Sequence, residues 1–517
     1  MLTITRLITL VLLSCLPGAA LAPRVVLGVP RSMNVPTRTV ERFVHIAPPG
    51  ANDSRYVYVP FDVPPNTTRV SVSYQYDRAR GANTIDLGLF DARSTGIDTD
   101  PRGFRGWSGG RRSDVFVSRD EATPGYMPGE MPAGRWRIIL GLYRIAETGV
   151  DVSFKIEIET SSVAGHRERT SSPGSTASSA LPGSSAKRSV APLLAGNGML
   201  WFAGDLHMHT VHSDGDWTIA GLISAARDAD LDFIVITDHN TASHHWEIDR
   251  LTRGSQEPLV LRGEEITTYG GHTNAWGLPS GTWIDFRTHP GDNARISEIA
   301  AQAHRAGALI SVNHPFVLCG GCAWSYDAAA PDFDAIEVWN GPWDFTDEPA
   351  VKMWDKILQT GRHITAVASS DSHRPDTPIG KPATHLAAKN LTQANLLMAI
   401  REGHAFLTDG VRGHGVAFEA EAATGKHRAR TIIGDQIRLG RPGNVRFFIS
   451  TRAAPSNTMI SLISNGQVLR TLTARTDGQP QVIELECQRD SYFRLEVRDA
   501  TKTMLALTNP IYVKVGQ

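Results

Sequence analysis

Residues 201–210 read WFAGDLHMHT, and this stretch decides how the rest of the chain is interpreted. An apolar run ends at Asp205-Leu206, and two histidines follow with one residue between them. On an extended strand, residues i and i+2 point to the same side, so His207 and His209 can bind one metal ion together. A lone His-x-His is more often a pair of structural histidines. The motif therefore gains its meaning from what ends the neighbouring strands.

Strand-like apolar runs alternate with amphipathic helical patterns from about Trp201 to Val411. The predicted strands end in the stretches 205–207, 234–238, 260–265, 309–313, 336–339 and 365–369. The predicted helices cover 219–229, 295–306, 350–360 and 393–402. Alternating β and α units predict a parallel sheet. About 210 residues and at least six or seven repeats favour a barrel over an open sheet.

Nearly every predicted strand of this region ends in residue types that bind metals. Fifteen of the 18 histidines lie between His207 and His414, which uniform scatter would not produce. The candidate metal ligands are His207, His209, Asp214, His239, Glu265, His272, His314, Asp371 and His373. The carboxyl ends of parallel barrel strands meet on one face, so these side chains should converge there. Nine ligands exceed one tetrahedral shell, and the imidazole–carboxylate mixture suits two to three divalent ions, Zn²⁺, Mn²⁺ or Fe²⁺.

Other polar residues near these strand ends are assigned outside the ligand set. Glu264 should point away by strand alternation, whereas Glu337 and Asn340 could orient the metal shell or the substrate. We expect His212 to face solvent or the pocket rim. His244 and His245 are interpreted as exposed loop residues, with substrate contact as the alternative. The histidines away from strand ends are interpreted as structural: His289, His304, His363, His385 and His404.

The order of motifs resembles the polymerase-and-histidinol-phosphatase (PHP) metallohydrolases. The matching strings are DLHMHT at 205–210, SDG at 213–215, TDHN at 237–240, GEEI at 263–266, GH at 271–272, NHP at 313–315 and SDSH at 370–373. The stretches 271–277 (GHTNAWG) and 336–341 (IEVWNG) resemble the carbaryl-hydrolase-type branch. The resemblance covers the whole middle region and implies a multidomain protein with a central α/β distorted (β/α)7 PHP barrel.

The resemblance also implies how the ligands divide among three ions. His207, His209, Glu265 and Asp371 would hold the first, and Glu265, His272 and His314 the second. Asp214, His239 and His373 would hold the third. Many relatives have histidine where Asp214 stands, so the third ion is expected to be held less firmly.

These sites predict an exported metal-dependent hydrolase that uses a metal-bridging hydroxide on a small-molecule ester. A phosphoesterase is favoured because three cations suit a phosphate. The alternative is a carbamate or carboxylic ester hydrolase, and a non-catalytic, metal-stabilised scaffold is the second alternative. His239, His373 or a metal-bound water would protonate the leaving group, and Arg374 could pair with an anionic group of the substrate. The oligomeric state is left open.

The flanking regions are predicted to be rich in β-structure. Residues 30–160 carry short strand runs separated by turn residues, which indicates a β-sandwich with a packing or presenting role. Residues 161–196 form a linker dense in Ser, Gly and Pro that is expected to be disordered. The metallohydrolase region spans 197–412, and a C-terminal β-rich domain covers 413–517. Cys319 and Cys322 are expected to form a local disulfide or remain idle thiols, in preference to a zinc site.

The N-terminus has the pattern of an export signal at residues 1–22. Arg6 precedes an apolar run, and Ala20-Leu21-Ala22 has the small-x-small form of a cleavage site. Leu12-Leu13-Ser14-Cys15 is the alternative, a lipobox that would anchor the protein through Cys15. Either predicts a periplasmic or secreted protein. No other run is long and apolar enough to cross a membrane, and a net charge of −1 argues against a nucleic-acid partner.

Overall fold

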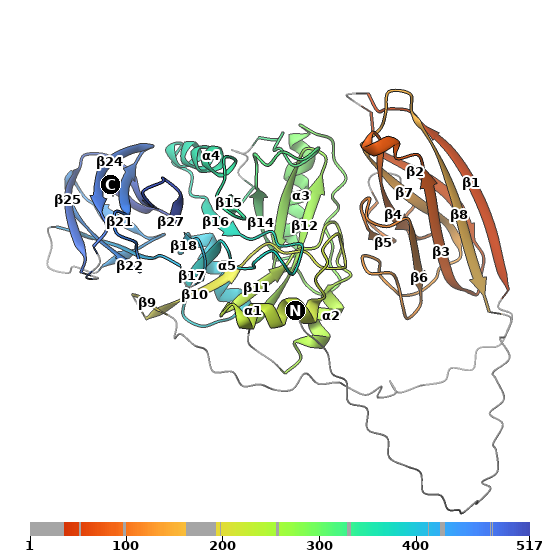
Figure 1. Cartoon of the computed structure of the whole chain (residues 1–517), viewed down its shortest axis with the longest axis horizontal. Coiled ribbons are helices and arrows are strands. Elements are labelled where there is room, and N and C mark those ends of the chain that lie inside the picture. Colours follow the sequence, from red (N-terminus) through yellow and green to blue (C-terminus); the bar gives the residue numbers. More distant parts are fainter. Residues whose placement is uncertain are drawn as a thin grey trace, which may run out of the picture.

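The computed structural model describes residues 36–516 except 51–52, 97–99, 162–192, 197, 255–257, 328–331, 412, 424–429, 476 and 478. The predicted export signal, Cys15 and most of the predicted linker lie outside the described residues. Within the described part, no helix is long and apolar enough to cross a membrane. Figure 1 shows three parts in a row, with the N-terminal strands at one end and the C-terminal strands at the other.

The N-terminal part is a sandwich of two antiparallel four-stranded sheets. One sheet has the order β1 (Thr37–Ile46), β8 (Val150–Thr160), β3 (Thr67–Tyr76), β6 (Asp114–Ser118). The other has the order β2 (Tyr56–Val63), β7 (Gly134–Arg144), β4 (Thr84–Phe90), β5 (Phe104–Trp107), and a short 3-10 turn, η1 (Ala79–Gly81), precedes β4. Alternate residues such as Val70, Leu87 and Ile156 are buried between the sheets, because a strand turns every second side chain to one face.

The middle part is built on a mixed sheet. Its strands follow the order β16 (Thr365–Ser369), β15 (Ala335–Asn340), β14 (Leu309–Asn313), β13 (Gly271–Trp276), β12 (Leu259–Thr268), β11 (Phe233–Ile236), β10 (Met199–Asp205), β17 (Ala383–Ala388), β18 (Ala405–Thr408). The neighbours in β10–β12 and in β14–β16 are parallel, but β13 is antiparallel to both β12 and β14.

This mixed sheet does not show the distorted (β/α)7 barrel that was expected. Only Tyr269 and Gly270 separate β12 from β13, which is too short for the crossover that a parallel pair needs. The two strands therefore form a hairpin. β16 approaches β17 through Thr384, whose Oγ1 accepts a hydrogen bond from Ala368 N at 2.9 Å.

Five helices cover the middle sheet, and their limits follow from capping residues. They are α1 (Ile219–Asp228), α2 (His245–Leu251), α3 (Asn293–Arg305), α4 (Asp347–Gln359) and α5 (Gln393–Glu402). The side chains of Thr218, Asp292 and Thr392 accept hydrogen bonds from the first turns of α1, α3 and α5. The helices predicted from apolar periodicity lie within two or three residues of α1, α3, α4 and α5.

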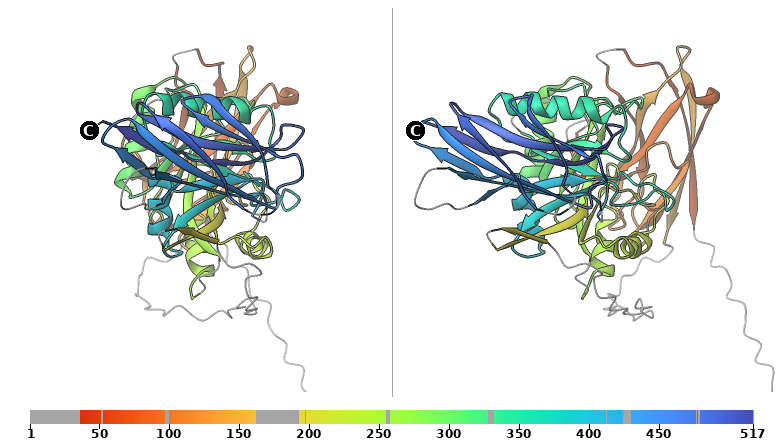
Figure 2. Two further views of the ribbon diagram at one scale, coloured as in Figure 1. Left: turned by 90° about the vertical axis from the view of Figure 1, so that its left-hand side faces the viewer. Right: turned by 60° about the vertical axis from the view of Figure 1, so that its left-hand side comes forward.

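One part of the C-terminal region continues the middle sheet, and another part forms a four-stranded sheet of its own. Phe406 of β18 pairs with Thr508 of β27 in an antiparallel register. The strands that follow are β19 (Gly415–Ala422), β20 (Thr431–Ile432), β21 (Gln436–Leu439), β22 (Gly443–Arg452), β23 (Met459–Ser464), β24 (Gln467–Thr473), β25 (Gln481–Cys487), β26 (Ser491–Arg498), β27 (Met504–Thr508) and β28 (Ile511–Val515). Figure 2 shows this part from its outer side.

A short strand also appears at the end of the predicted linker. β9 (Leu193–Gly196) pairs antiparallel with β10, so these four residues are ordered by the middle sheet. The expectation of disorder to residue 196 is therefore wrong for them.

The sandwich packs against the middle part through aromatic side chains. Phe104 stacks on Trp283 with ring centroids 3.8 Å apart, and Trp107 meets Phe286 at 4.8 Å. Polar contacts join the same surfaces, including the bond from Gly125 N to Ser243 Oγ at 3.0 Å. One apolar cluster thus includes residues of both parts.

Candidate metal centre

Two segments from opposite ends of the middle part lie side by side at the centre of the site. Beyond β10, Met208 forms a parallel bridge with Ser372, and His209 N donates to Ser372 O at 3.0 Å. The i, i+2 spacing turns His207 and His209 to the side that Asp371 also faces, and His209 Nε2 is 3.1 Å from Asp371 Oδ1. The backbone of Asp371 has a φ of +51°. This conformation is uncommon for residues other than glycine, and it is found most often at functional sites.

Glu265 on β12 is the point where five histidines meet. Its carboxylate is buried among His207, His209, His239, His272 and His314. Oε1 is 3.3 Å from His207 Nε2, 3.2 Å from His272 Nδ1 and 3.1 Å from His314 Nε2. Oε2 is 2.8 Å from His239 Nδ1 and 3.4 Å from His209 Nε2. A carboxylate with imidazoles on both oxygens is placed to bridge two ions.

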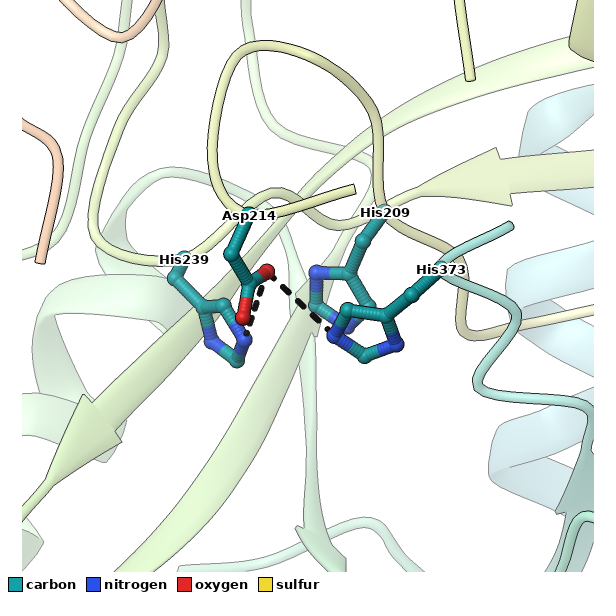
Figure 3. Close-up of side chains that lie close together, drawn as sticks. All are labelled: His209, Asp214, His239 and His373. Carbon is teal, nitrogen blue, oxygen red and sulfur yellow. Dashed lines mark ion pairs between the residues drawn. The ribbon is translucent and has the colours of Figure 1, made fainter. Parts of the chain in front are cut away.

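Asp214 forms a second centre next to the first. Its Oδ1 lies between two rings, 3.5 Å from His239 Nε2 and 3.3 Å from His373 Nε2, as Figure 3 shows. His209 completes this group, whose four ligand atoms lie within 4.8 Å of one another. The Asp214 side chain is 46 % exposed, whereas four of the five histidines around Glu265 are buried: His207, His209, His272 and His314.

The structure brings together all nine residues that the sequence singled out. Three groups of potential ligands correspond to the three expected shells: His207, His209 and Glu265; Glu265, His272 and His314; and His209, Asp214, His239 and His373. Asp371 lies 3.4 Å from His207 Nε2, beside the first group.

The antiparallel hairpin explains how His272 reaches the site. Thr267 of β12 is paired with His272 of β13, so the start of β13 lies at the same sheet edge as the end of β12. His272 therefore joins the site from the beginning of a strand, although the sequence suggested a residue just beyond a strand end.

Several buried atoms of this cluster have no hydrogen-bond partner. They are His207 Nε2, both ring nitrogens of His209, Glu265 Oε2, His314 Nδ1 and Asp371 Oδ1. Buried polar atoms are nearly always paired, since an unpaired one costs about 1–3 kcal/mol. Nitrogens and carboxylate oxygens that face one another without partners are a donor set for cations. The residues present therefore fit divalent metal ions.

The charges of the cluster agree with this assignment. Burial alone would raise the pKa of the Glu265 carboxyl, but His207, His239 and His272 hold that pKa well below its usual range. Burial, together with the His373 and His239 rings, lowers the pKa of His209 to about 4. His209 is therefore neutral at pH 7, which is the form that binds metals.

The pKa of His373 moves in the opposite direction. Burial disfavours its charged ring, yet Asp214 and Asp371 raise the pKa of His373 to about 9. In the absence of another cation, protons on histidines balance the buried carboxylates. Metal ions would take over that role and release protons.

A further set of polar residues fixes the orientation of the cluster. Glu337 lies 3.1 Å from His207 Nδ1 and accepts a hydrogen bond from His314 N, also at 3.1 Å. Asn340 Nδ2 donates to Glu337 at 3.0 Å. Glu337 and Asn340 were expected to orient either the metal shell or the substrate. Asn313 was not expected to have such a role, although its Nδ2 donates a hydrogen bond to Glu265 Oε1 at 3.1 Å. The sequence signal for Asn313 is its place beside His314 at the end of β14.

Some sequence expectations near the site are wrong. His244 and His245 are buried, not exposed, and each ring places Nε2 about 3 Å from Gly263 O. They precede or begin α2, which packs this loop against β12. His212 is also buried and contacts Ser243 Oγ at 2.8 Å.

Other expectations agree with what the structure shows. Glu264 points away from the cluster, and its Oε2 accepts a hydrogen bond from Ile284 N at 2.7 Å. Four of the histidines interpreted as structural contact other parts of the fold. His304 contacts Asp334 and His363 contacts Tyr512. His385 contacts Thr408 and His404 contacts Asp435. Arg374 is 67 % exposed, with its Nε 3.8 Å from Asp216 Oδ2.

A cavity of about 520 Å³ opens above the cluster and is lined by both the middle part and the sandwich. The middle part contributes seven ligand candidates and the disulfide between Cys319 and Cys322. The sandwich contributes Asp86, Trp107 and Tyr143, among others. No sequence pattern indicated that these three residues would line a cavity. Asp86 alternates with inward-facing Ile85 and Leu87 like an ordinary surface residue of a strand.

No protein-family model matches the chain, and no match is found among the curated proteins. Among solved structures, a two-domain protein from Bacteroides vulgatus that contains a predicted PHP-like metal-dependent phosphoesterase is 17% identical. That similarity covers 61% of this chain and 96% of that one, with a TM-score of 0.36. An amidohydrolase from Chromobacterium violaceum is 14% identical over 34% of this chain and 89% of its own, with a TM-score of 0.26. TM-scores this low do not identify the function.

Proposed function

We propose that this chain is a metal-dependent hydrolase of phosphoesters, with its active site in residues 197–412. The observation that carries the proposal is the cluster around Glu265, where five histidines surround one buried carboxylate and several buried ligand atoms lack hydrogen bonds. A scaffold would be more stable with those atoms paired or replaced by apolar groups. The proposal includes export to the periplasm or the medium, on the pattern of residues 1–22.

Divalent ions held at this cluster would activate water and stabilise negative charge on the reacting phosphoryl group. We assign the first ion to His207, His209, Glu265 and Asp371, the second to Glu265, His272 and His314, and the third to Asp214, His239 and His373. Glu337 keeps the His207 ring in place through Nδ1, which leaves Nε2 directed at the site. The chain itself supplies no serine or cysteine nucleophile in this proposal.

The Asp214 group provides the proton donors. Asp214 Oδ1 lies between His239 Nε2 and His373 Nε2, and its exposure makes it the weakest of the three metal positions. Where no third ion is bound, Asp214 Oδ1 lies 3.3 Å from His373 Nε2 and favours a proton there, so His373 is placed to protonate a leaving alcohol. Arg374 would pair with an anionic group of the substrate at the rim.

A carbamate or carboxylic ester hydrolase of the carbaryl-hydrolase type is the second candidate. The aromatic side chains of Trp107 and Tyr143 in the cavity wall favour it, because they could cover an aryl group. It would need two ions where the phosphoesterase uses three.

Two neighbouring glutamates allow a matched test. Glu265→Gln removes the bridging carboxylate and is expected to lower phosphoesterase kcat/KM by about 10³-fold or more and the bound metal by at least one ion per chain. Glu264→Gln is the control. Glu264 points away from the cluster and accepts a hydrogen bond from Ile284 N, which the amide oxygen of a glutamine can also accept.

The measurements are elemental analysis of the purified chain and hydrolysis of phosphate mono- and diesters after reconstitution with Mn²⁺ or Zn²⁺. Activity should disappear with a chelator and return with the metal. Carbamate or aryl-ester turnover without phosphatase activity would replace the phosphoester proposal. Less than one ion per chain, with no hydrolysis, would favour the scaffold.

A further inference from the structure

The β-sandwich forms one wall of the cavity above the metal centre, and two of the hydrogen bonds that hold it there come from residues that line or adjoin the cavity. Tyr269 Oη, just beyond β12, donates to Asp86 Oδ2 of β4 at 2.7 Å. Gly320 N, in the loop that follows His314, donates to Tyr143 Oη of β7 at 2.7 Å. These contacts come from the same loops that carry ligand candidates. The wall is therefore fixed relative to the metal centre.

Asp86 has one carboxylate oxygen occupied and one available. Oδ2 accepts the Tyr269 hydrogen bond, whereas Oδ1 accepts none within the described residues. Oδ1 lies 3.5 Å from the point where a Cβ on Gly110 would stand. Both Asp86 and Gly110 line the cavity. The available oxygen is thus an acceptor on the cavity side of the sandwich.

Trp107 supplies a donor next to this acceptor. Its ring packs on Phe286, and its Nε1 donates no hydrogen bond to any described residue. A Cβ on Gly109 would stand 3.9 Å from Asp86 Oδ1 and 4.0 Å from Trp107 Nε1. Gly109 has a φ of +54°, and as a glycine it leaves this space open. An acceptor and a donor therefore border one empty space on the wall opposite the metal cluster.

We propose that Asp86 and Trp107 bind a hydroxyl group on the alcohol part of the substrate. The substrates are then esters of hydroxylated alcohols, such as polyols or sugars. A hydroxyl is the small neutral group that both donates and accepts: it donates to Asp86 Oδ1 and accepts from Trp107 Nε1. The inference rests on the proposed function, because the ester bond is taken to lie at the Glu265 cluster.

Other groups fit this space less well. A purely apolar or aryl alcohol would remove water from both polar atoms without replacing its hydrogen bonds, which disfavours binding. An ammonium group would pair with Asp86 but would leave the Trp107 N–H without an acceptor. The hydroxyl satisfies both.

The test compares glycerol 3-phosphate with propyl phosphate, which has the same phosphate and carbon chain but no further hydroxyl. In the metal-reconstituted full chain, kcat/KM is expected to favour glycerol 3-phosphate by roughly tenfold, as for one hydrogen bond. Asp86→Asn keeps an acceptor for Tyr269 but replaces the second oxygen by a donor. It should reduce that preference roughly tenfold.

A second variant and a control separate recognition from folding. Gly110→Ala would place a methyl group 3.5 Å from Asp86 Oδ1 and no closer than 3.4 Å to any other atom. It covers the oxygen without a clash or a change of charge, and it should also reduce the preference. Asp62→Asn is the control, because Asp62 is 67 % exposed on β2 of the same sandwich and lies outside the cavity lining.

The outcomes distinguish this inference from the proposed function. Equal kcat/KM for the two phosphates, or a preference that persists in both variants, overturns the hydroxyl site while leaving the phosphoesterase intact. If neither phosphate is hydrolysed, the proposed function fails, and calorimetric binding of the same two phosphates decides. Tighter binding of glycerol 3-phosphate that is lost in Asp86→Asn supports the hydroxyl site, and equal Kd values overturn it.

Discussion

The two β-rich ends join the middle part in different ways. The C-terminal strands are joined through the main chain, because β27 extends the middle sheet beyond β18. Among the described strands, none of the sandwich pairs with the middle sheet. The sandwich instead meets the loops that carry the ligand candidates, through aromatic packing and side-chain hydrogen bonds. Both ends consist of β-strands, but only the sandwich lies next to the sheet edge that carries the ligand candidates. Only the sandwich can therefore influence the reaction at the metal centre.

The difference predicts that the C-terminal junction contributes stability and the sandwich junction contributes selectivity. A variant at the first should change the free energy of unfolding without changing which substrate is preferred. A variant at the second should change substrate preference more than stability.

The largest expected effect is at the C-terminal junction. Arg494 of β26 is 3 % exposed and lies 2.9 Å from Asp355 Oδ1 of α4 and 2.8 Å from Glu496 Oε1. Arg494→Met leaves Asp355 buried without its cation, so the free energy of unfolding should fall by about 3–5 kcal/mol. Urea denaturation measures it.

Arg470→Met on β24 is the control for that variant. Arg470 is exposed, and its loss should change stability by less than about 0.5 kcal/mol. The folded fraction of Arg494→Met should keep its bound metal and its substrate preference. A shift in preference would contradict the division between the two ends.

A smaller effect comes from pH at the same junction. His385 of β17 is buried, with Nε2 2.9 Å from Thr408 Oγ1 of β18. Burial, with a smaller contribution from Arg452, lowers the pKa of His385 to about 3, whereas an unfolded histidine titrates near pH 6.5. The unfolded state therefore binds the proton first as the pH falls. Stability is lost from pH 6.5 downward, by roughly 2 kcal/mol at pH 5.

His385→Gln tests this dependence because glutamine does not titrate in that range. The advantage of the unmodified chain over the variant should shrink by roughly 2 kcal/mol between pH 7 and pH 5. An advantage that stays constant with pH would show that His385 is not held neutral.

The smallest effect on stability belongs to the sandwich junction. Tyr269→Phe removes the hydrogen bond to Asp86, so we expect a loss of about 1 kcal/mol and a KM for glycerol 3-phosphate that rises more than kcat falls. Tyr58→Phe removes a hydrogen bond of the same interface, in which Arg287 Nη1 donates to Tyr58 Oη at 2.9 Å. This variant should lower the free energy of unfolding by a similar amount and leave the KM for glycerol 3-phosphate unchanged. Equal KM effects in the two variants would argue against a positioning role for Tyr269.

The sequence indicated which residues would lie close together where those residues belong to repeated local patterns. An apolar run precedes or ends at each of five ligand candidates: His207, His239, Glu265, His314 and Asp371. Because the strand ends converge, these side chains lie close together. The apolar runs and the amphipathic helical patterns predicted most of the strands of the middle part and four of its helices. The ligand candidates could be found because each is tied to a strand by short-range geometry.

The remainder depends on contacts that leave no local pattern. β13 was missed because GHTNAW has neither strict alternation nor a continuous apolar run, and the antiparallel hairpin changed the topology of the sheet. Asp86 became part of the cavity only because the sandwich docks there. The burial of His244 and His245 likewise results from α2 packing on β12, which short-range periodicity does not reveal.

The bridge between Met208 and Ser372 has a consequence for how the protein folds. It joins the first and last ligand-bearing segments of the middle part, so His207 and His209 meet Asp371 only after the intervening chain has been ordered. Loop closure of that length is slow. Metal uptake should therefore be among the last events of folding. Because the metal would bind the native state and not the unfolded state, it would shift the folding equilibrium toward the native state. A chain truncated before β16 should take up no metal at the first position.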